Sequence, residues 1–285
     1  MSSADATDTL MVIEPSRGWG VARLRELWVY RELLYFLVWR DVKVRYKQTV
    51  LGAAWAILQP LATAAVFTLF FGRLAGIDGD GLPYPLFAYA GLLAWTLFAQ
   101  GLTQGASSLV GSANLITKVY FPRMVVPMSA VLGGLVDFAV ALPILLVMMA
   151  HYQRWPGAGL AFFPLFVVMA VVASTGVATW LAALNVRYRD VRYVVPFLVQ
   201  IWLFVTPVIY PASKLAPLLA EWGLPRWLPG LNPMAGVVEG FRWSLFGTGS
   251  QSLPLIAASA VTAVFFLISG TLYFQHVERS FADVV

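Results

Sequence analysis

The sequence predicts an all-α, polytopic membrane protein with six transmembrane helices and an N-terminal interfacial helix. Hydrophobic residues make up 60% of the 285 residues and charged residues only 12%, about half the charged share of an average soluble domain. The apolar residues form continuous runs long enough to cross a hydrocarbon core of ~30 Å. They lack the strict alternation of a transmembrane barrel. Finally, a basic and aromatic segment precedes the first run.

That segment, residues 21–50, is predicted to be a cytoplasmic amphipathic helix at the membrane surface. Helical spacing places Tyr35, Trp39 and Val42 on one stripe and puts Lys43 and Lys47 beside it. Such a helix suits the membrane interface, where its cations meet lipid phosphates. Residues 1–20 carry acidic residues and lack the pattern of a signal peptide. They are expected to form a disordered cytoplasmic tail.

Residues 51–274 are predicted to form the transmembrane domain, followed by a cytoplasmic tail at 275–285. The six expected spans are 51–71, 86–105, 128–150, 160–184, 194–210 and 253–274. Pro60 lies inside the first span, where its ring removes a backbone hydrogen bond, so a kink is expected there.

The basic residues predict the orientation. Most of the 19 Lys and Arg residues lie in segments on one side of these spans. By the positive-inside rule, that side is cytoplasmic. Both termini are therefore expected in the cytoplasm, in agreement with an even number of spans. Orientation also explains the net charge of +5, so no nucleic-acid partner is expected.

The connection between the fifth and sixth spans contains two short apolar pieces, Lys214–Trp222 and Pro233–Phe246. Each is too short to cross the bilayer, which favours re-entrant or interfacial helices. Counting the second piece as a seventh span would place Glu239 and Arg242 in the middle of the bilayer. Three residues apart on a helix, these two side chains can pair with each other.

The sequence lacks the motifs of catalysis. It has no G-x-x-x-x-G-K-[ST] phosphate loop, no H-E-x-x-H motif, no cysteine and only two histidines. We therefore expect no catalytic residue, metal site or cofactor in this chain. A channel or carrier is favoured over an enzyme.

Two short loops, 112–123 and 185–196, mix aromatic residues with cations on the predicted cytoplasmic side. One interpretation is docking onto a cytoplasmic partner. The other is that their basic residues only enforce topology.

Asp137 lies inside the third apolar run, where an ionised carboxylate is costly. It is either an acid that lines or gates a pore, or a hydrogen-bonding group for helix packing beside Gly133 and Gly134.

Aromatic residues make up 14% of the chain. Their rings could guide a polysaccharide, because sugar rings have apolar C–H faces, but Trp and Tyr also favour membrane interfaces. The pore candidates are Tyr89, Trp95, Phe98, Trp202, Phe204 and Tyr210.

Four stretches together resemble the permease subunit of a polysaccharide-exporting ABC transporter of the ABC-2 type, which moves O-antigen, teichoic acid or capsular chains. They are WRDVKVRYKQTVLGAAWAILQPL, NLITKVYFPRMVVP, NVRYRDVRYVVPFLVQIWLFVTPVIYP and LNPMAGVVEGFRWSLFG, and they extend over nearly the whole chain. The resemblance implies the ABC-2, type V exporter-like permease fold.

The resemblance also implies roles for particular residues. The loop matching the coupling helix, which docks on the ATPase, contains Asn114, Lys118, Tyr120, Phe121 and Arg123. The interfacial helix would present Arg40, Lys43, Arg45 and Lys47 to a lipid pyrophosphate, or to anionic lipid. The periplasmic gate, with the piece that follows it, would contain Pro211, Trp222, Trp227, Asn232, Pro233, Glu239 and Arg242.

The partners implied by the resemblance are a second copy of this chain and two copies of an ABC ATPase, which would hold ATP and Mg²⁺. The substrate would be an undecaprenyl-pyrophosphate-linked polysaccharide, and the site of action the bacterial inner membrane and its lipids. Two alternatives remain open: an ABC-2 permease for a drug or small lipid, and a proton-driven secondary flippase that uses Asp137.

Overall fold

The computed structural model describes residues 28–47, 52–247 and 253–278. Within these ranges every regular element is a helix, apart from an isolated antiparallel bridge between Gly79 and Leu82. The predicted tail at 1–20 lies outside the described residues, as does most of the predicted tail at 275–285.

Five helical segments in the described part of the chain are long and apolar enough to cross a membrane. The first joins α3 (Gly52–Phe67) to the π-helix η1 (Thr68–Leu74), and the second is α4 (Tyr84–Gly111). The others are α6 (Val125–His151), α7 (Phe163–Arg187) with its preceding 3₁₀ turn η2 (Ala158–Phe162), and α11 (Leu253–Glu278).

The predicted fifth span is shorter in the structure than expected. Helix α8 (Val191–Val205) has 15 residues, about 22 Å at 1.5 Å per residue. It ends before the predicted boundary at Tyr210 because Thr206 adopts an extended conformation. Thr206 precedes Pro207, and the proline ring disfavours the helical conformation of the residue before it.

The remaining elements are short. They are α2 (Arg31–Lys47), α5 (Ala113–Lys118), η3 (Ala212–Lys214), α9 (Leu215–Glu221), η4 (Leu228–Leu231) and α10 (Pro233–Phe246). Helix α10 has clear end signals. The side chain of Asn232 caps its first turn by accepting from the backbone N–H of Met234, and Gly247 ends it in the left-handed conformation.

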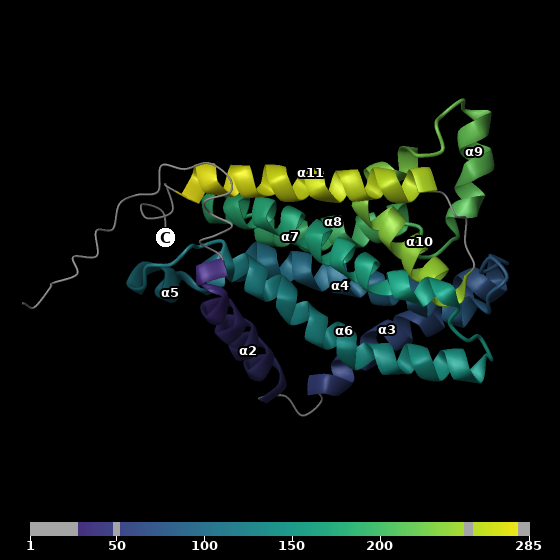
Figure 1. Cartoon of the computed structure of the whole chain (residues 1–285), viewed down its shortest axis with the longest axis horizontal. Helices are drawn as coiled ribbons and strands as arrows, with labels where there is room; N and C mark the ends of the chain where they lie inside the picture. Colours follow the sequence, from purple (N-terminus) through teal and green to yellow (C-terminus); the bar gives the residue numbers. More distant parts are fainter. Residues whose placement is uncertain (1–27, 48–51, 248–252, 279–285) are drawn as a thin grey trace, which may run out of the picture.

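Helix α4 is the central element, packed against α6, α7 and α10, and it is the most buried of the spans. Helix α11 lies along α7 on the outside of this group (Figure 1). The two helices approach closely at Gly176 and Gly270. A Cβ atom on Gly176 would lie 2.5 Å from the backbone nitrogen of Leu267, so a side chain there would push the helices apart.

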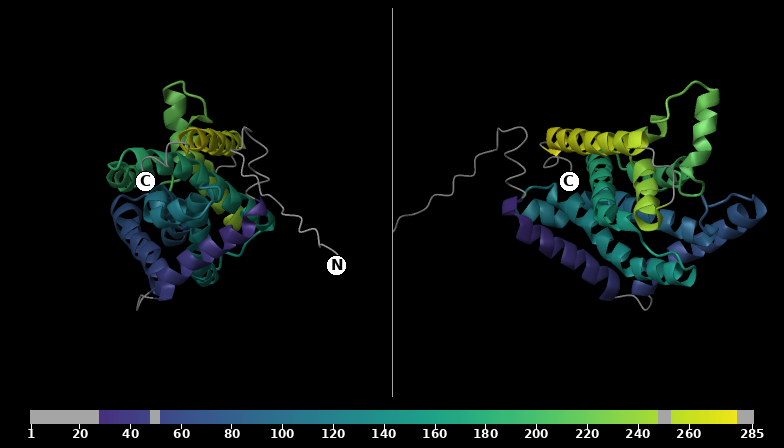
Figure 2. Two further views of the ribbon diagram at one scale, coloured as in Figure 1. Left: turned by 90° about the vertical axis from the view of Figure 1, so that its left-hand side faces the viewer. Right: turned by 45° about the vertical axis from the view of Figure 1, so that its right-hand side comes forward.

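The two ends of the bundle differ. Helix α5, the beginning of α2 and the end of α11 gather at one end, whereas α9 stands upright at the other end (Figures 1 and 2). A second apolar core, which we call the α5-end core, fills the first of these ends. It contains Leu37, Leu109, Ile116, Phe121, Val125, Val126, Ala182, Ala183, Val186, Phe274 and Val277.

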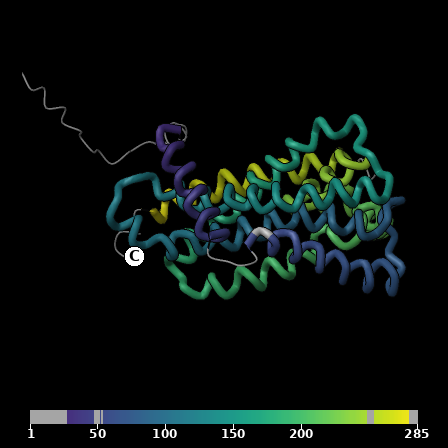
Figure 3. Tube along the Cα trace, turned by 90° about the horizontal axis from the view of Figure 1, so that it is seen from below, coloured from purple at the N-terminus to yellow at the C-terminus, as the bar shows by residue number. Residues whose placement is uncertain are grey.

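Helix α2 lies obliquely across the outside of the bundle (Figure 3). It contacts the bundle through Leu37, which is 2% exposed, and the neighbouring Leu33 and Leu34. Tyr35 and Trp39 of the predicted stripe take no part in this contact, because both are exposed. These aromatic side chains are left on a surface where lipid headgroups could meet them.

Candidate functional site

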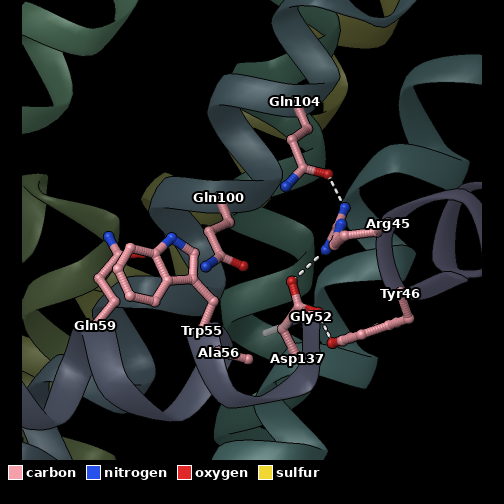
Figure 4. Close-up of a pocket in the computed structure, with 9 residues that line it drawn as sticks. All are labelled: Arg45, Tyr46, Gly52, Trp55, Ala56, Gln59, Gln100, Gln104 and Asp137. Atoms are coloured by element: carbon pink, nitrogen blue, oxygen red, sulfur yellow. Dashed lines mark hydrogen bonds and ion pairs between the residues drawn. The ribbon is translucent and has the colours of Figure 1, made fainter. Parts of the chain in front are cut away.

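A polar cluster joins three helices on one side of the bundle (Figure 4). The guanidinium of Arg45 in α2 forms an ion pair with the carboxylate of Asp137 in α6, and it also donates to the amide oxygen of Gln104 in α4. The hydroxyl of Tyr46 donates to the other carboxylate oxygen of Asp137. Asp137 is only 6% exposed, and burying a carboxylate is costly unless partners such as these compensate it.

Tyr46 is held as a donor in this cluster. Burial, followed by the hydrogen bond to Asp137 and the charge of that carboxylate, raises the pKa of the Tyr46 phenol above its usual value. The phenol therefore keeps its proton, and both side chains at the end of α2 bind the same carboxylate.

These contacts change the interpretation of Asp137. Its partners come from α2 rather than from a helix packed beside Gly133 and Gly134. The ion pairs also divide the four cations predicted to bind pyrophosphate into two that are paired with a carboxylate and two that are exposed. Arg45 pairs with Asp137 and Arg40 pairs with Asp41 at 2.8 Å, whereas Lys43 and Lys47 are exposed.

Next to the cluster lies a pocket of about 370 Å³, which we call the amide pocket. Its walls come from α2, α3, α4 and α6 (Figure 4). The lining residues are Arg45, Tyr46, Gly52, Trp55, Ala56, Gln59, Gln100, Gln104 and Asp137. The buried side-chain oxygen of Gln100 has no hydrogen-bond partner among the described residues.

A second ion pair is fully buried. Glu239 and Arg242 in α10 pair at 3.2 Å, and each residue is 2% exposed. The pairing predicted from their spacing is confirmed. Arg242 also donates to the backbone oxygens of Pro207 and Val208, both at 2.7 Å, and its guanidinium carbon lies 3.5 Å from the centre of the Phe87 ring.

The close approach of Arg242 to α4 depends on Gly91. A Cβ atom there would lie 2.5 Å from a guanidinium nitrogen of Arg242. Glu239 accepts a hydrogen bond from the backbone N–H of Ala212 at 3.2 Å. The pair therefore ties α10 to α4 and to the chain that follows α8.

The other predicted gate residues lie at the same end of the bundle. The Asn232 amide accepts from the indole N–H of Trp202 at 3.0 Å and donates to the hydroxyl of Thr206 at 2.9 Å. Pro211 and Pro233 are buried, whereas Trp222 and Trp227 are exposed. The predicted gate region is thus attached through Asn232 to Trp202 of α8 and to Thr206, and it has two exposed indoles.

The predicted pore aromatics occupy two kinds of environment. Tyr89, Trp95 and Phe98 are buried in the core of the chain, and the Tyr89 hydroxyl donates to the backbone oxygen of Ala141 at 3.0 Å. Trp202 packs edge-on against Phe98, with ring centres 5.1 Å apart. Phe204 is exposed, and the partly buried Tyr210 has its hydroxyl 3.2 Å from the backbone oxygen of Phe204.

The predicted coupling loop has an exposed part and an anchored part. Asn114, Lys118 and Tyr120 are exposed, whereas Phe121 is 5% exposed and lies in the α5-end core. The Arg123 guanidinium donates to the backbone oxygen of Glu278 at 3.0 Å, and its backbone N–H donates to the Glu278 carboxylate at 3.3 Å. The loop is therefore fastened to the end of α11.

Sequence reasoning did not single out most of the residues of the amide pocket. Trp55, Gln59, Gln100 and Gln104 were not candidates, although a signal was present. The three glutamines lie inside runs otherwise dominated by apolar residues, where polar side chains usually face a cavity or a partner.

The long apolar helices, the buried ion pairs and the exposed short helix between two spans define a multi-pass helical membrane protein. The sequence profile of the family described as ABC-2 type transporter matches residues 32–246. The chain belongs to this family, whose membrane subunits are transport components.

Three relatives illustrate the range of similarity. The chain is 32% identical to the O-antigen export system permease protein RfbA of Myxococcus xanthus, over 92% of this chain and 98% of that protein. It is 27% identical to a Klebsiella pneumoniae protein of the same name, over 89% and 95% of the two chains. It is 21% identical to the polysialic acid transport protein KpsM of Escherichia coli, over 82% and 89%.

Proposed function

We propose that the chain is the permease subunit of an ATP-driven transporter that exports a lipid-linked, O-antigen-like polysaccharide across the bacterial inner membrane. The observation that carries the proposal is the similarity to an O-antigen export permease along 98% of that relative. It extends through the interfacial helix, the spans and the short helices together, so it is not confined to one motif.

Two copies of the chain would form the translocation path and bind two copies of an ATPase subunit, which would hold ATP and Mg²⁺. Both termini would face the cytoplasm. Helix α8 together with residues 206–210 would form the fifth of six spans, and α11 the sixth. Membership in the ABC-2 transporter family supports the need for an ATPase partner.

The docking surface would be the exposed part of the α5 loop, Asn114, Lys118 and Tyr120. Phe121 and Ile116 root this loop in the α5-end core, which also includes side chains from α2, α4, α6, α7 and α11. Because a close-packed core transmits displacement rather than absorbing it, movement of α5 would move several helices together. At the other end, the contacts of α10 and Asn232 would convert that movement into opening of the gate.

The carrier pyrophosphate would first meet Lys43 and Lys47 on α2, since both are exposed. Arg45 would act differently, because its guanidinium already binds Asp137 and Gln104. The same contacts disfavour the proton-driven alternative. Both carboxylate oxygens of Asp137 are occupied, by a cation and by a hydroxyl donor.

Co-expression with the cognate ATPase tests this proposal. We expect the two proteins to co-purify and the ATPase activity to depend on the permease. Deleting the gene for this chain from its host should leave the polysaccharide inside the cell. Normal surface polysaccharide in the deletion strain would contradict the proposal, and so would an ATPase that neither binds nor responds to the chain.

A further inference from the structure

The amide pocket has the chemistry of a site for a neutral polar ligand. Three of its lining residues, Gln59, Gln100 and Gln104, carry amides that can both donate and accept hydrogen bonds. The charged lining residues are Arg45 and Asp137, which neutralise each other. A pocket without net positive charge would bind a phosphate weakly, whereas its amides suit a ligand rich in hydroxyl groups.

One acceptor in the pocket is unused. The side-chain oxygen of Gln100 is buried without a partner among the described residues. A buried acceptor that is not hydrogen-bonded is unfavourable. A hydroxyl donated by a ligand in the pocket would satisfy it. The amide of Gln104, in contrast, already accepts from Arg45 and is held in place.

The pocket also contains a flat apolar surface. Trp55 lines it and is 62% exposed, so the indole is not covered by the described part of the chain. Figure 4 shows this ring in the same space as the amides of Gln59 and Gln100. An aromatic ring beside several amides matches a sugar, whose C–H face is apolar and whose edge carries hydroxyls.

We propose that the amide pocket binds one sugar ring of the transported glycan, with the ring face against Trp55 and one of its hydroxyls donated to Gln100. The proposal rests on the proposed function, and it names a site within it. The volume of about 370 Å³ lies at the lower end of the range for small-molecule pockets, ~300–1,000 Å³. It suits a single ring better than a longer piece of polymer.

The ion pair beside the pocket gives this site a connection to the interfacial helix. Arg45 and Tyr46 line the pocket and bind Asp137, so α2 forms part of its wall. A ring in the pocket would therefore lie next to the helix where Lys43 and Lys47 would hold the carrier pyrophosphate.

Site-specific photo-crosslinking in the polysaccharide-producing host tests the proposal. A benzoylphenylalanine residue would replace Gln59 in the complete chain, expressed with its partner ATPase. The control is the same replacement at Val261, which is 69% exposed on α11. After illumination, the purified chain would be examined for a heavier, glycan-stained and periodate-sensitive product. We expect this product from position 59 and not from position 261.

Two further variants test the contacts in the position-59 background. Trp55→Ala should lower the capture about tenfold, as expected for loss of one aromatic contact, whereas Trp55→Phe should retain it. Gln100→Met keeps the size of the side chain and removes the amide, so it should also lower capture. Each variant's amount in the membrane, measured through an affinity tag, shows whether it folds.

Equal capture at positions 59 and 261 would overturn the proposal, as would a product that contains lipid but no glycan. Capture unchanged in both Trp55→Ala and Gln100→Met would overturn it too. The deletion strain separates this outcome from failure of the proposed function. If deletion stops export but position 59 captures no glycan, the pocket proposal alone fails; if deletion leaves export unchanged, both proposals fail.

Discussion

The guanidinium of Arg45 in α2 and the carboxylate of Asp137 in α6 form an ion pair between residues 92 positions apart in the sequence. The pair joins the helix outside the bundle to a span inside it. Because Asp137 is buried and Arg45 is only partly exposed, each side chain depends on the other to offset the cost of leaving water.

We expect Asp137→Asn to lower the free energy of unfolding by about 1–3 kcal/mol. This is less than the ~3–5 kcal/mol for breaking a fully buried pair, because the Arg45 side chain is 27% exposed. Arg45→Gln should have a similar effect. The double variant should recover part of the loss, since two neutral amides leave no unpaired charge. Thermal unfolding of the purified protein measures these changes, and strictly additive losses would contradict the coupling.

Arg242→Met should be far more damaging than most substitutions in this chain. It leaves the Glu239 carboxylate buried without its cation and removes donors from the backbone oxygens of Pro207 and Val208. A loss of ~3–5 kcal/mol is expected. Arg226→Met is a matched control on an exposed arginine. The amount of folded protein extracted from membranes should fall sharply for the first variant and remain unchanged for the second.

Charge reversal at Lys118 should weaken binding of the ATPase about tenfold, because this side chain is exposed on the α5 loop and a rim charge of the wrong sign opposes association. Co-purification at several salt concentrations measures the effect. Arg226→Glu, an equivalent change at an exposed arginine between α9 and η4, should leave binding intact. Equal binding by the Lys118→Glu variant would remove this residue from the docking surface.

Arg123 is not an equivalent test of docking. Its side chain and backbone contact Glu278, so Arg123→Glu would also place a carboxylate beside another carboxylate at the end of α11. We expect this substitution to destabilise the permease even without the ATPase. A normal melting temperature for the isolated variant would contradict that expectation.

Replacing Lys43 and Lys47 together by Gln should raise the KM for lipid-linked substrate without disturbing the complex with the ATPase. Each cation near an anionic surface contributes about 1 kcal/mol, so a change of roughly tenfold or more is expected. Transport assays in neutral and in anionic lipid distinguish the two roles. A defect confined to anionic lipid would assign the pair to membrane anchoring instead.

Local sequence pattern predicted the elements well. Five of the six expected spans appear as long apolar helices, and the spacing of Glu239 and Arg242 predicted their pairing. Two elements differ from the prediction, and only the shortened α8 has a local cause in the sequence. Pro207 shortens α8 by holding Thr206 extended. The π-helical end of the first span, Thr68–Leu74, has no signature of this kind.

The sequence patterns could not predict which side chains from distant segments contact each other. Nothing in the periodicity of 31–47 or 125–151 says that Arg45 meets Asp137, because that contact depends on how α2 crosses the bundle. The same holds for burial. Tyr89, Trp95 and Phe98 resembled pore-lining residues by type, yet α4 is surrounded by other helices and these rings lie in the core.

Transport by the purified complex tests the central claim most directly. The permease and its cognate ATPase would be reconstituted in vesicles carrying lipid-linked polysaccharide on the ATPase side, and the polymer would be measured on the far side with a polysaccharide hydrolase. The account predicts that polymer becomes accessible only with ATP and only when both proteins are present. Accessible polymer without ATP, or transport driven by a proton gradient alone, would contradict it.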